Sequence, residues 1–284
     1  MKKPKKSLAV RNLVIGSEGF LGISLCDYLK EKGETVTRFD IKQSRKEDGR
    51  TANLHLERFD RVYFLAWEVG GSKYLYRQDT QLIQLNWNVE LLRNVMLQLQ
   101  KHKTSFIFVS SQLADETDTI YGALKKLGEL WTHQLKGGCV RLWNIYGGKE
   151  ALDEKSHVIS DFVHQAVTTG KIKMMTTGEE RRQFTHVLDV CEALHILMDK
   201  QLWGKVYDLT TFEWVSIHQI AALIASYTGA KVFLGQVKGV DRLNATIKGK
   251  LPTWAPRTDL ETGLQGLIAQ HPKFKRRRQL RGLE

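Results

Sequence analysis

Short apolar runs alternate with amphipathic stretches over the first half of this 284-residue chain. Four of the runs are rich in β-branched and aromatic residues, which predicts strands at residues 12–17, 35–40, 61–66 and 105–111. Between them, residues 21–33 and 87–102 carry apolar side chains at helical spacing, as does the stretch from residue 121 to 136. Strands and helices that alternate in this order are typical of βαβ units. We therefore expect an α/β fold with a parallel sheet.

A glycine-rich turn follows the first predicted strand. Gly16, Gly19 and Gly22 stand in "VIGSEGFLG", with Phe20 and Leu21 between the last two, at the start of the next helix. Glycines permit a tight turn and let the backbone approach a pyrophosphate, which then sits at the helix N-terminus. The spacing is G-x-x-G-x-x-G rather than the commoner G-x-G-x-x-G, so a tight turn without a ligand is the alternative.

An acidic residue ends the second predicted strand. Asp40 follows the glycines by roughly 20 residues, where an acid can bind the ribose hydroxyls of a dinucleotide. A carboxylate there would repel the 2′-phosphate of NADP, so the motif favours NAD. Arg38 and Lys42 lie close by in the sequence and leave NADP as the less favoured alternative.

A tyrosine and a lysine begin the amphipathic stretch after residue 120. On a helix, Tyr121 and Lys125 would lie on one face, and the preceding strand ends in Ser110 and Ser111. A phenol, whose ordinary pKa is about 10, is a weak base at neutral pH. A neighbouring ammonium and a bound nicotinamide would stabilise the phenolate, and a serine could align the reacting hydroxyl. A surface tyrosine beside a solvated lysine is the alternative, which the glycine turn makes less favoured.

Taken together, these motifs resemble the extended short-chain dehydrogenase/reductases of the NAD-dependent epimerase/dehydratase family, which act on nucleotide sugars. The resemblance covers nearly the whole chain and includes "GSEGFLG", "FDRVYFLAWEVGG", "FIFVSS", "YGALKKLGE", "VRLWNIYGG" and "GEERRQFTHVLDV". It implies a Rossmann-type, doubly wound parallel sheet with a smaller C-terminal α/β cap that binds the substrate. We expect residues 1–150 to form the NAD-binding domain, with 186–214 returning to the sheet, and 151–185 and 215–284 to form the cap.

The same resemblance implies a role for individual residues. Ser111, Tyr121 and Lys125 would be catalytic, and Lys125 and Ala66 would also contact NAD along with the glycine turn and Asp40. Asn88 would support the active site. The residues implied to contact a nucleotide-diphosphate sugar are Gln112, Asn144, Arg182 and Arg242.

Three positions depart from the family pattern. The segment between Asp40 and Asp60 is short and polar, so we expect its helix to be trimmed or lost. Asn53 stands where many relatives carry an aspartate that faces adenine. Trp67 replaces a small residue beside the cofactor cleft, where it would either narrow the pocket or pack into the core.

The residues after Ser111 bear on which reaction follows. Family dehydratases carry an acidic pair here and family decarboxylases a glutamate, whereas this chain has Gln112 and Leu113. Asp115 and Glu116 come later, in a loop that we expect to be solvated. This favours an NAD-dependent epimerase that oxidises C4 and returns the hydride. The alternatives are a 4-ketoreductase, a 4,6-dehydratase with unusual acid placement, and a dinucleotide-binding regulatory protein without catalysis.

Composition and charge narrow the setting. The formal charge of +12 lies largely in "KKPKK" and "KFKRRRQLR" near the two ends, which favours solvated tails over a nucleic-acid partner. No apolar run is long enough to span a membrane, and the histidines show no metal-ligand spacing with Cys or carboxylates. Three separated cysteines in apolar stretches predict buried thiols and a cytoplasmic protein. The family further implies a homodimer through the helices at 88–101 and 121–136.

Overall fold

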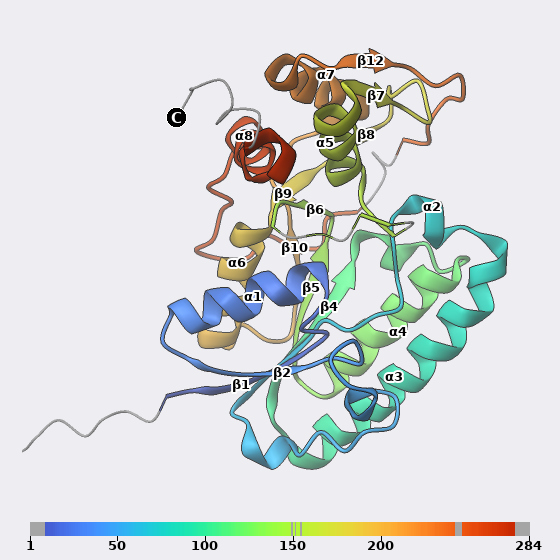
Figure 1. Ribbon diagram of the computed structural model, residues 1–284. Coiled ribbons are helices and arrows are strands. Elements are labelled where there is room, and N and C mark those ends of the chain that lie inside the picture. The colour runs from blue at the N-terminus through green and yellow to red at the C-terminus, as the bar shows by residue number, and fades with distance from the viewer. Residues whose placement is uncertain (1–8, 149, 151, 154, 242–245, 276–284) are drawn as a thin grey trace, which may run out of the picture.

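A six-stranded parallel sheet forms the centre of the computed structural model, which describes residues 9–148, 150, 152–153, 155–241 and 246–275 (Figure 1). The strands lie in the order β2-β1-β3-β4-β5-β10, and every neighbouring pair is parallel. Their bounds are β1 (Arg11–Ile15), β2 (Thr35–Phe39), β3 (Arg61–Phe64), β4 (Ser105–Ser111), β5 (Gly138–Leu142) and β10 (Val206–Leu209). The predicted Rossmann-type fold is therefore confirmed.

The central strands are mostly apolar because helices cover both faces of the sheet. Leu13, Val14 and Ile15 of β1 are all buried, although successive side chains point to opposite faces. Three strands end earlier than predicted, β1 at Ile15, β2 at Phe39 and β3 at Phe64. The residues that follow them turn away from the sheet and line the cavity described below.

Two pairs of helices make the outer layers (Figure 1). On one face, α1 (Phe20–Glu31) packs against α6 (Val187–Asp199), with Leu25 and Leu194 in the core between them and the sheet. On the other face lie α3 (Gln81–His102) and α4 (Ile120–Gln134), above a core that contains Leu92, Val95 and Met96. Cys26, Cys139 and Cys191 are free and buried, as predicted.

A smaller α/β region stands at one end of the sheet (Figure 1) and has a core of its own. It contains α5 (Val158–Thr169), α7 (Ile217–Thr228) and α8 (Leu260–Gln270). Three short strand pairs complete it: β6 (Asn144–Tyr146) with β9 (Phe184–His186), β7 (Lys171–Lys173) with β12 (Lys231–Phe233), and β8 (Arg181–Arg182) with β11 (Val215–Ser216). Since β6 follows β5 directly, this region joins the sheet at the carboxyl end of its strands.

The connections differ from a regular βαβ pattern at several points. Between β2 and β3 the chain forms two single-turn 3-10 helices, η1 (Arg45–Glu47) and η2 (Leu56–Arg58), so the expected loss of a helix there is confirmed. After β3 come a short α2 (Ser72–Leu75) and η3 (Gln78–Thr80). After β4 comes η4 (Gln112–Asp115), which holds the residues next to Ser111.

Candidate active site

A cavity of about 460 Å³ opens at the carboxyl ends of β1 and β3, where the order of the strands reverses. Ligands of doubly wound folds bind at this switch point. The cavity brings together all of the predicted catalytic and cofactor-binding residues. They are Gly16, Gly19, Phe20, Leu21, Gly22, Asp40, Ala66, Ser111, Tyr121 and Lys125.

The glycine turn is closed so tightly that side chains could not fit. Gly16 has a φ of 92°, and a Cβ atom on it would lie 2.5 Å from the backbone nitrogen of Ala66. A Cβ atom on Gly22 would lie 2.0 Å from the carbonyl oxygen of Gly16. The turn therefore presents bare backbone at the N-terminus of α1, which is the arrangement that accepts a pyrophosphate.

Acidic side chains line the end of the cavity that lies next to the end of β2. Asp40 is 9% exposed, and its carboxylate accepts hydrogen bonds of 2.9 Å from the backbone N–H groups of Glu18 and Lys42. Asp48 also lines the cavity, whereas the Asn53 side chain accepts a hydrogen bond from the backbone of His55 outside it. Asn53 does not line the cavity, and the adenine-facing role that the resemblance gives to its position stays a prediction.

Ser111 and Tyr121 meet at the opposite end. Ser111 ends β4, and its hydroxyl accepts a hydrogen bond from the backbone N–H of Leu113, the second residue of η4. Burial raises the pKa of Tyr121 to about 12, and a hydrogen bond with Ser111 acts in the opposite direction. Burial therefore makes this phenol a weaker acid than a solvated tyrosine. A positive charge placed beside it would lower its pKa.

Lys125 is buried beside Tyr121. Its Nζ atom lies 5.8 Å from the Tyr121 ring centre and donates a 2.8 Å hydrogen bond to the carbonyl of Val109. Burial lowers the pKa of Lys125 to about 7, because few groups replace the water that an ammonium loses. The ammonium also lies 3.9 Å from the ring centre of Trp67, a cation–π contact.

Trp67 and Asn88 line the part of the cavity beside Lys125. Trp67 lines the cavity and also packs edge-on against Phe108, so it both narrows the site and belongs to the core. The buried side chain of Asn88 in α3 exchanges two hydrogen bonds with the backbone of Glu68, of 2.8 and 3.0 Å. This amide holds the loop after β3 in place beside Lys125, consistent with the supporting role that the sequence implied.

Residues 12–209 match the NAD dependent epimerase/dehydratase family. The chain belongs to this family. The match spans the whole Rossmann-type sheet, from β1 to β10, and thus every predicted cofactor-binding and catalytic residue.

Individual relatives of this family differ in the reaction they perform. A UDP-N-acetyl-alpha-D-glucosaminuronate decarboxylase of Bacillus cytotoxicus is 25% identical over an alignment of 262 residues, covering 77% of this chain and 80% of the relative. An epimerase of Methanothermobacter thermautotrophicus has a similar structure, with a TM-score of 0.78, 20% identity and coverage of 96% and 94%. The UDP-glucuronic acid 4-epimerase of Bacillus cereus, solved with UDP-glucuronic acid and NAD, has a TM-score of 0.77, 21% identity and coverage of 94% and 99%.

Of the residues expected to bind the sugar nucleotide, Gln112, Asn144 and Arg182 are not among those that line the cavity. Gln112 begins η4, and the Asn144 side chain donates to the carbonyl of Gln183. The Arg182 guanidinium donates to the carbonyls of Arg181 and Val240 in the cap. Arg242 lies outside the described residues. The family roles of these residues therefore stay predictions.

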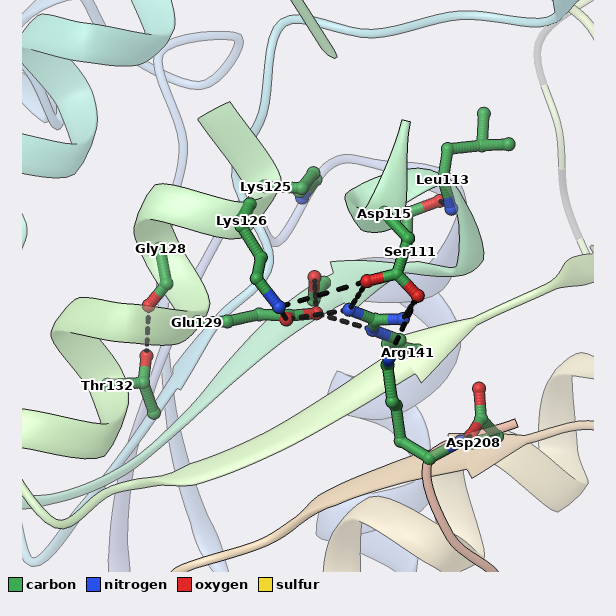
Figure 2. Close-up of polar contacts among 12 residues, drawn as sticks. Ser111, Leu113, Asp115, Lys125, Lys126, Gly128, Glu129, Thr132, Arg141 and Asp208 are labelled. Atoms are coloured by element: carbon green, nitrogen blue, oxygen red, sulfur yellow. Dashed lines mark hydrogen bonds and ion pairs between the residues drawn. The ribbon is translucent and has the colours of Figure 1, made fainter. Parts of the chain in front are cut away.

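The loop after Ser111 differs from the sequence expectation. Asp115 is not simply solvated, because the guanidinium of Arg141 in β5 donates to its carboxylate at 2.8 and 3.0 Å (Figure 2). Lys248 lies 3.0 Å from the same carboxylate. Lys126 lies 3.4 Å from Glu129 and 3.8 Å from Asp115. These contacts hold the pKa of Asp115 well below its usual range.

Several cavity residues were not singled out from the sequence. Glu18 and Glu47 lie near Asp40, and Glu68, Lys155 and His157 line the opposite wall. Neither their spacing nor their composition distinguishes them from surface residues, since distant segments bring them together. In the described part of the chain, no group of three or more metal-binding side chains occurs and no helix is long and apolar enough to cross a membrane.

Proposed function

We propose that the protein is an NAD-dependent nucleotide-sugar epimerase, which oxidises C4 of the sugar and returns the hydride to the opposite face. The observation that carries this proposal is the shared cavity of Ser111, Tyr121, Lys125 and the glycine turn. Membership of the NAD-dependent epimerase/dehydratase family supports the same chemistry.

The cavity suits NAD. The bare backbone of the glycine turn would hold the pyrophosphate, and Asp40 would accept hydrogen bonds from the adenosine ribose. When bound, NAD supplies a hydride acceptor and a positive charge near the phenol. Lys125 would then hold the nicotinamide ribose, and Trp67 would keep its ammonium in place.

The protein residues would move one proton. Ser111 would bind the C4 hydroxyl, and the Tyr121 phenolate would remove its proton as the hydride leaves C4. Return of the hydride to the other face would be accompanied by return of the proton from Tyr121. The cycle is redox neutral, so it needs no external reductant.

Decarboxylation and dehydration are less well supported, although the Bacillus cytotoxicus relative is a decarboxylase. Both would need a carboxyl group close to Ser111. The residues directly after it are Gln112 and Leu113, and the carboxylate of Asp115 is held by Arg141. Its depressed pKa makes Asp115 a poor general acid at neutral pH.

The two proposed parts of the chain are assigned different ligands. We propose that residues 1–150 with 186–214 bind NAD, and that the cap of 151–185 and 215–284 binds a nucleotide-diphosphate sugar, with Arg182 as a pyrophosphate ligand. Two relatives support a UDP sugar, since one acts on UDP-N-acetylglucosaminuronate and one binds UDP-glucuronic acid.

Measuring the sugar products together with any net change in NADH tests the proposed reaction. The protein is incubated with NAD and, in turn, with UDP-glucose, UDP-galactose, UDP-glucuronic acid or UDP-galacturonic acid, and the products are separated by chromatography and identified by NMR. We expect a pair of C4 epimers to interconvert without net formation of NADH. Stoichiometric formation of NADH together with a 4-keto sugar would identify a ketoreductase running in reverse, and release of CO₂ a decarboxylase. NAD binding without turnover of any nucleotide sugar would support the regulatory alternative.

We further propose a homodimer that packs through α3 and α4. One apolar side of α3 is buried in the protomer core and is not available to a partner. It consists of Leu91, Leu92, Val95 and Met96. The outward apolar side chains are instead Leu82, Ile83, Val89 and Leu97 of α3 and Leu127 and Leu130 of α4. Since α3 packs against α4, these side chains lie on neighbouring helices of the same layer.

Charge on this face should dissociate the dimer. We expect light scattering to give about twice the 32.6 kDa of one chain for the unmodified protein and a single-chain mass for Leu130→Asp. A buried, unpaired carboxylate at the interface would oppose association. Leu234→Asp is the matched control, because Leu234 lies in the cap and both leucines are 56% exposed. A monomeric unmodified protein would contradict the proposal, as would equal effects of the two substitutions.

A further inference from the structure

An ion pair ties the glycine turn to the end of β2. The Arg38 guanidinium lies 2.7 Å from the carboxylate of Glu18, and its Nε atom donates to Glu18 at 2.8 Å. Its Nη2 atom donates at 2.9 Å to the carbonyl of Ser17. The side chain of Gln43 donates to the same Glu18 oxygen. Arg38 is thus held by three contacts on the outside of the turn.

The pair lies next to the proposed ribose-binding carboxylate. The backbone N–H of Glu18 donates at 2.9 Å to Asp40, so Glu18 contacts both Arg38 and Asp40. Glu18, Asp40 and Lys42 line the cavity, whereas Arg38 does not. Glu47 lines it as well and accepts a hydrogen bond from the backbone N–H of Asp40.

The charges at this end of the cavity select against a phosphate. Four carboxylates, those of Glu18, Asp40, Glu47 and Asp48, line this end of the cavity. The two cations there are Lys42 and Arg50, and the guanidinium of Arg50 is paired with Asp48 at 2.6 Å. A guanidinium is the group best suited to bind a phosphate, through two parallel hydrogen bonds. Arg38 stands two residues before Asp40 and would be the natural ligand of a 2′-phosphate, but Glu18 already occupies its hydrogen-bonding edge.

We propose that Glu18 is a specificity-determining residue, which excludes NADP by holding Arg38 away from the 2′-position of the adenosine ribose. The inference rests on the proposed binding of NAD in this cavity. Asp40 repels the phosphate directly, and Glu18 withholds the cation that would compensate for that repulsion. NAD lacks the phosphate and needs neither group to move.

Direct binding measurements test this inference without any sugar substrate. Dissociation constants for NADH and NADPH are measured by calorimetry on the full chain. We expect the unmodified protein to bind NADH at least ~10-fold more tightly than NADPH, and Glu18→Ala to gain ~10-fold in affinity for NADPH, the worth of one charge-assisted contact. NADH affinity should change by less than about twofold. The double variant Glu18→Ala with Arg38→Ala should lose the gain.

Glu31→Ala is the matched control, because it removes the same charge from the exposed end of α1, outside the cavity. It should leave both affinities unchanged. Selective NADH binding that Glu18→Ala does not alter would overturn the inference alone. A gain that persists after Arg38 is also removed would do the same. Binding of neither dinucleotide by the unmodified protein would overturn the inference together with the proposed function.

Discussion

Replacing Tyr121 with Phe is expected to lower nucleotide-sugar turnover by about 10³-fold, within the range that a positioned proton-transfer group contributes. The substitution removes one hydroxyl and leaves the ring beside Lys125 and Ser111. Because the glycine turn and Asp40 are proposed to hold the other end of the cofactor, the dissociation constant for NAD should change by less than about twofold. Steady-state rates on the epimerised sugar and calorimetry with NAD measure the two effects.

The outcome separates a chemical role from a structural one. Tyr28→Phe is the control, since Tyr28 lies on α1 with its ring against His195 and does not line the cavity. It should keep full turnover. The catalytic assignment fails when the Tyr121 variant retains more than about a tenth of the turnover, or when it loses NAD binding to the same extent as activity.

Arg141→Met is expected to reduce the free energy of unfolding by about 3–5 kcal/mol, the usual cost of removing one partner from a buried ion pair. Arg141 is fully buried in β5, and its Nε atom donates at 2.6 Å to Glu129, which is 5% exposed (Figure 2). The substitution leaves that buried carboxylate with the Ser110 hydroxyl as a neutral donor and with the half-exposed Lys126 at 3.4 Å. Urea unfolding at pH 7 measures the loss, with the exposed Arg93→Met as control.

Removing both charges should restore much of this stability. A second substitution, Glu129→Leu in the Arg141→Met background, replaces the pair by apolar groups, which is often close to neutral. A double variant no more stable than Arg141→Met would contradict this account of the ion pair.

The same network gives the protein a dependence on acid. A carboxyl whose pKa is lower in the folded than in the unfolded state stabilises the fold above its unfolded pKa, which is about 4 for aspartate. The pKa of Asp115 is lowered chiefly by its hydrogen bonds with Arg141. The unmodified protein should therefore lose this stabilisation as the pH falls below about 4, and Arg141→Met should lose less of it.

How far the site could be predicted depends on whether its parts are local in sequence. The glycine turn lies within seven residues of one strand-to-helix connection, and Tyr121 and Lys125 lie one helical turn apart. Parallel strands end at one edge of a sheet, so the positions of Asp40 and Ser111 also followed from the order of strands. These residues meet in the cavity as the sequence indicated.

Contacts between distant segments could not be predicted in this way. Arg141 stands within the apolar run of β5, and no periodicity indicates that it reaches Asp115, 26 residues earlier. Asp48 reaches the cavity through the irregular segment after β2, whose path the sequence pattern does not give. In the sequence, nothing distinguishes Glu18 from other polar loop residues. Its proposed role depends on its ion pair with Arg38, which lies 20 residues later.

Two adjacent residues of helix α3 lie on opposite sides of the helix and have different proposed roles. Asn88 points inward and clamps the loop that carries Trp67, while Val89 is 39% exposed among the side chains proposed to meet a second protomer. A second protomer packed against Val89 would therefore restrict the motion of Asn88 and of the loop that places Trp67 beside Lys125. Assembly and catalysis would then be thermodynamically linked, so that diluting the protein below its dimer dissociation constant weakens cofactor binding, and saturating cofactor tightens the dimer.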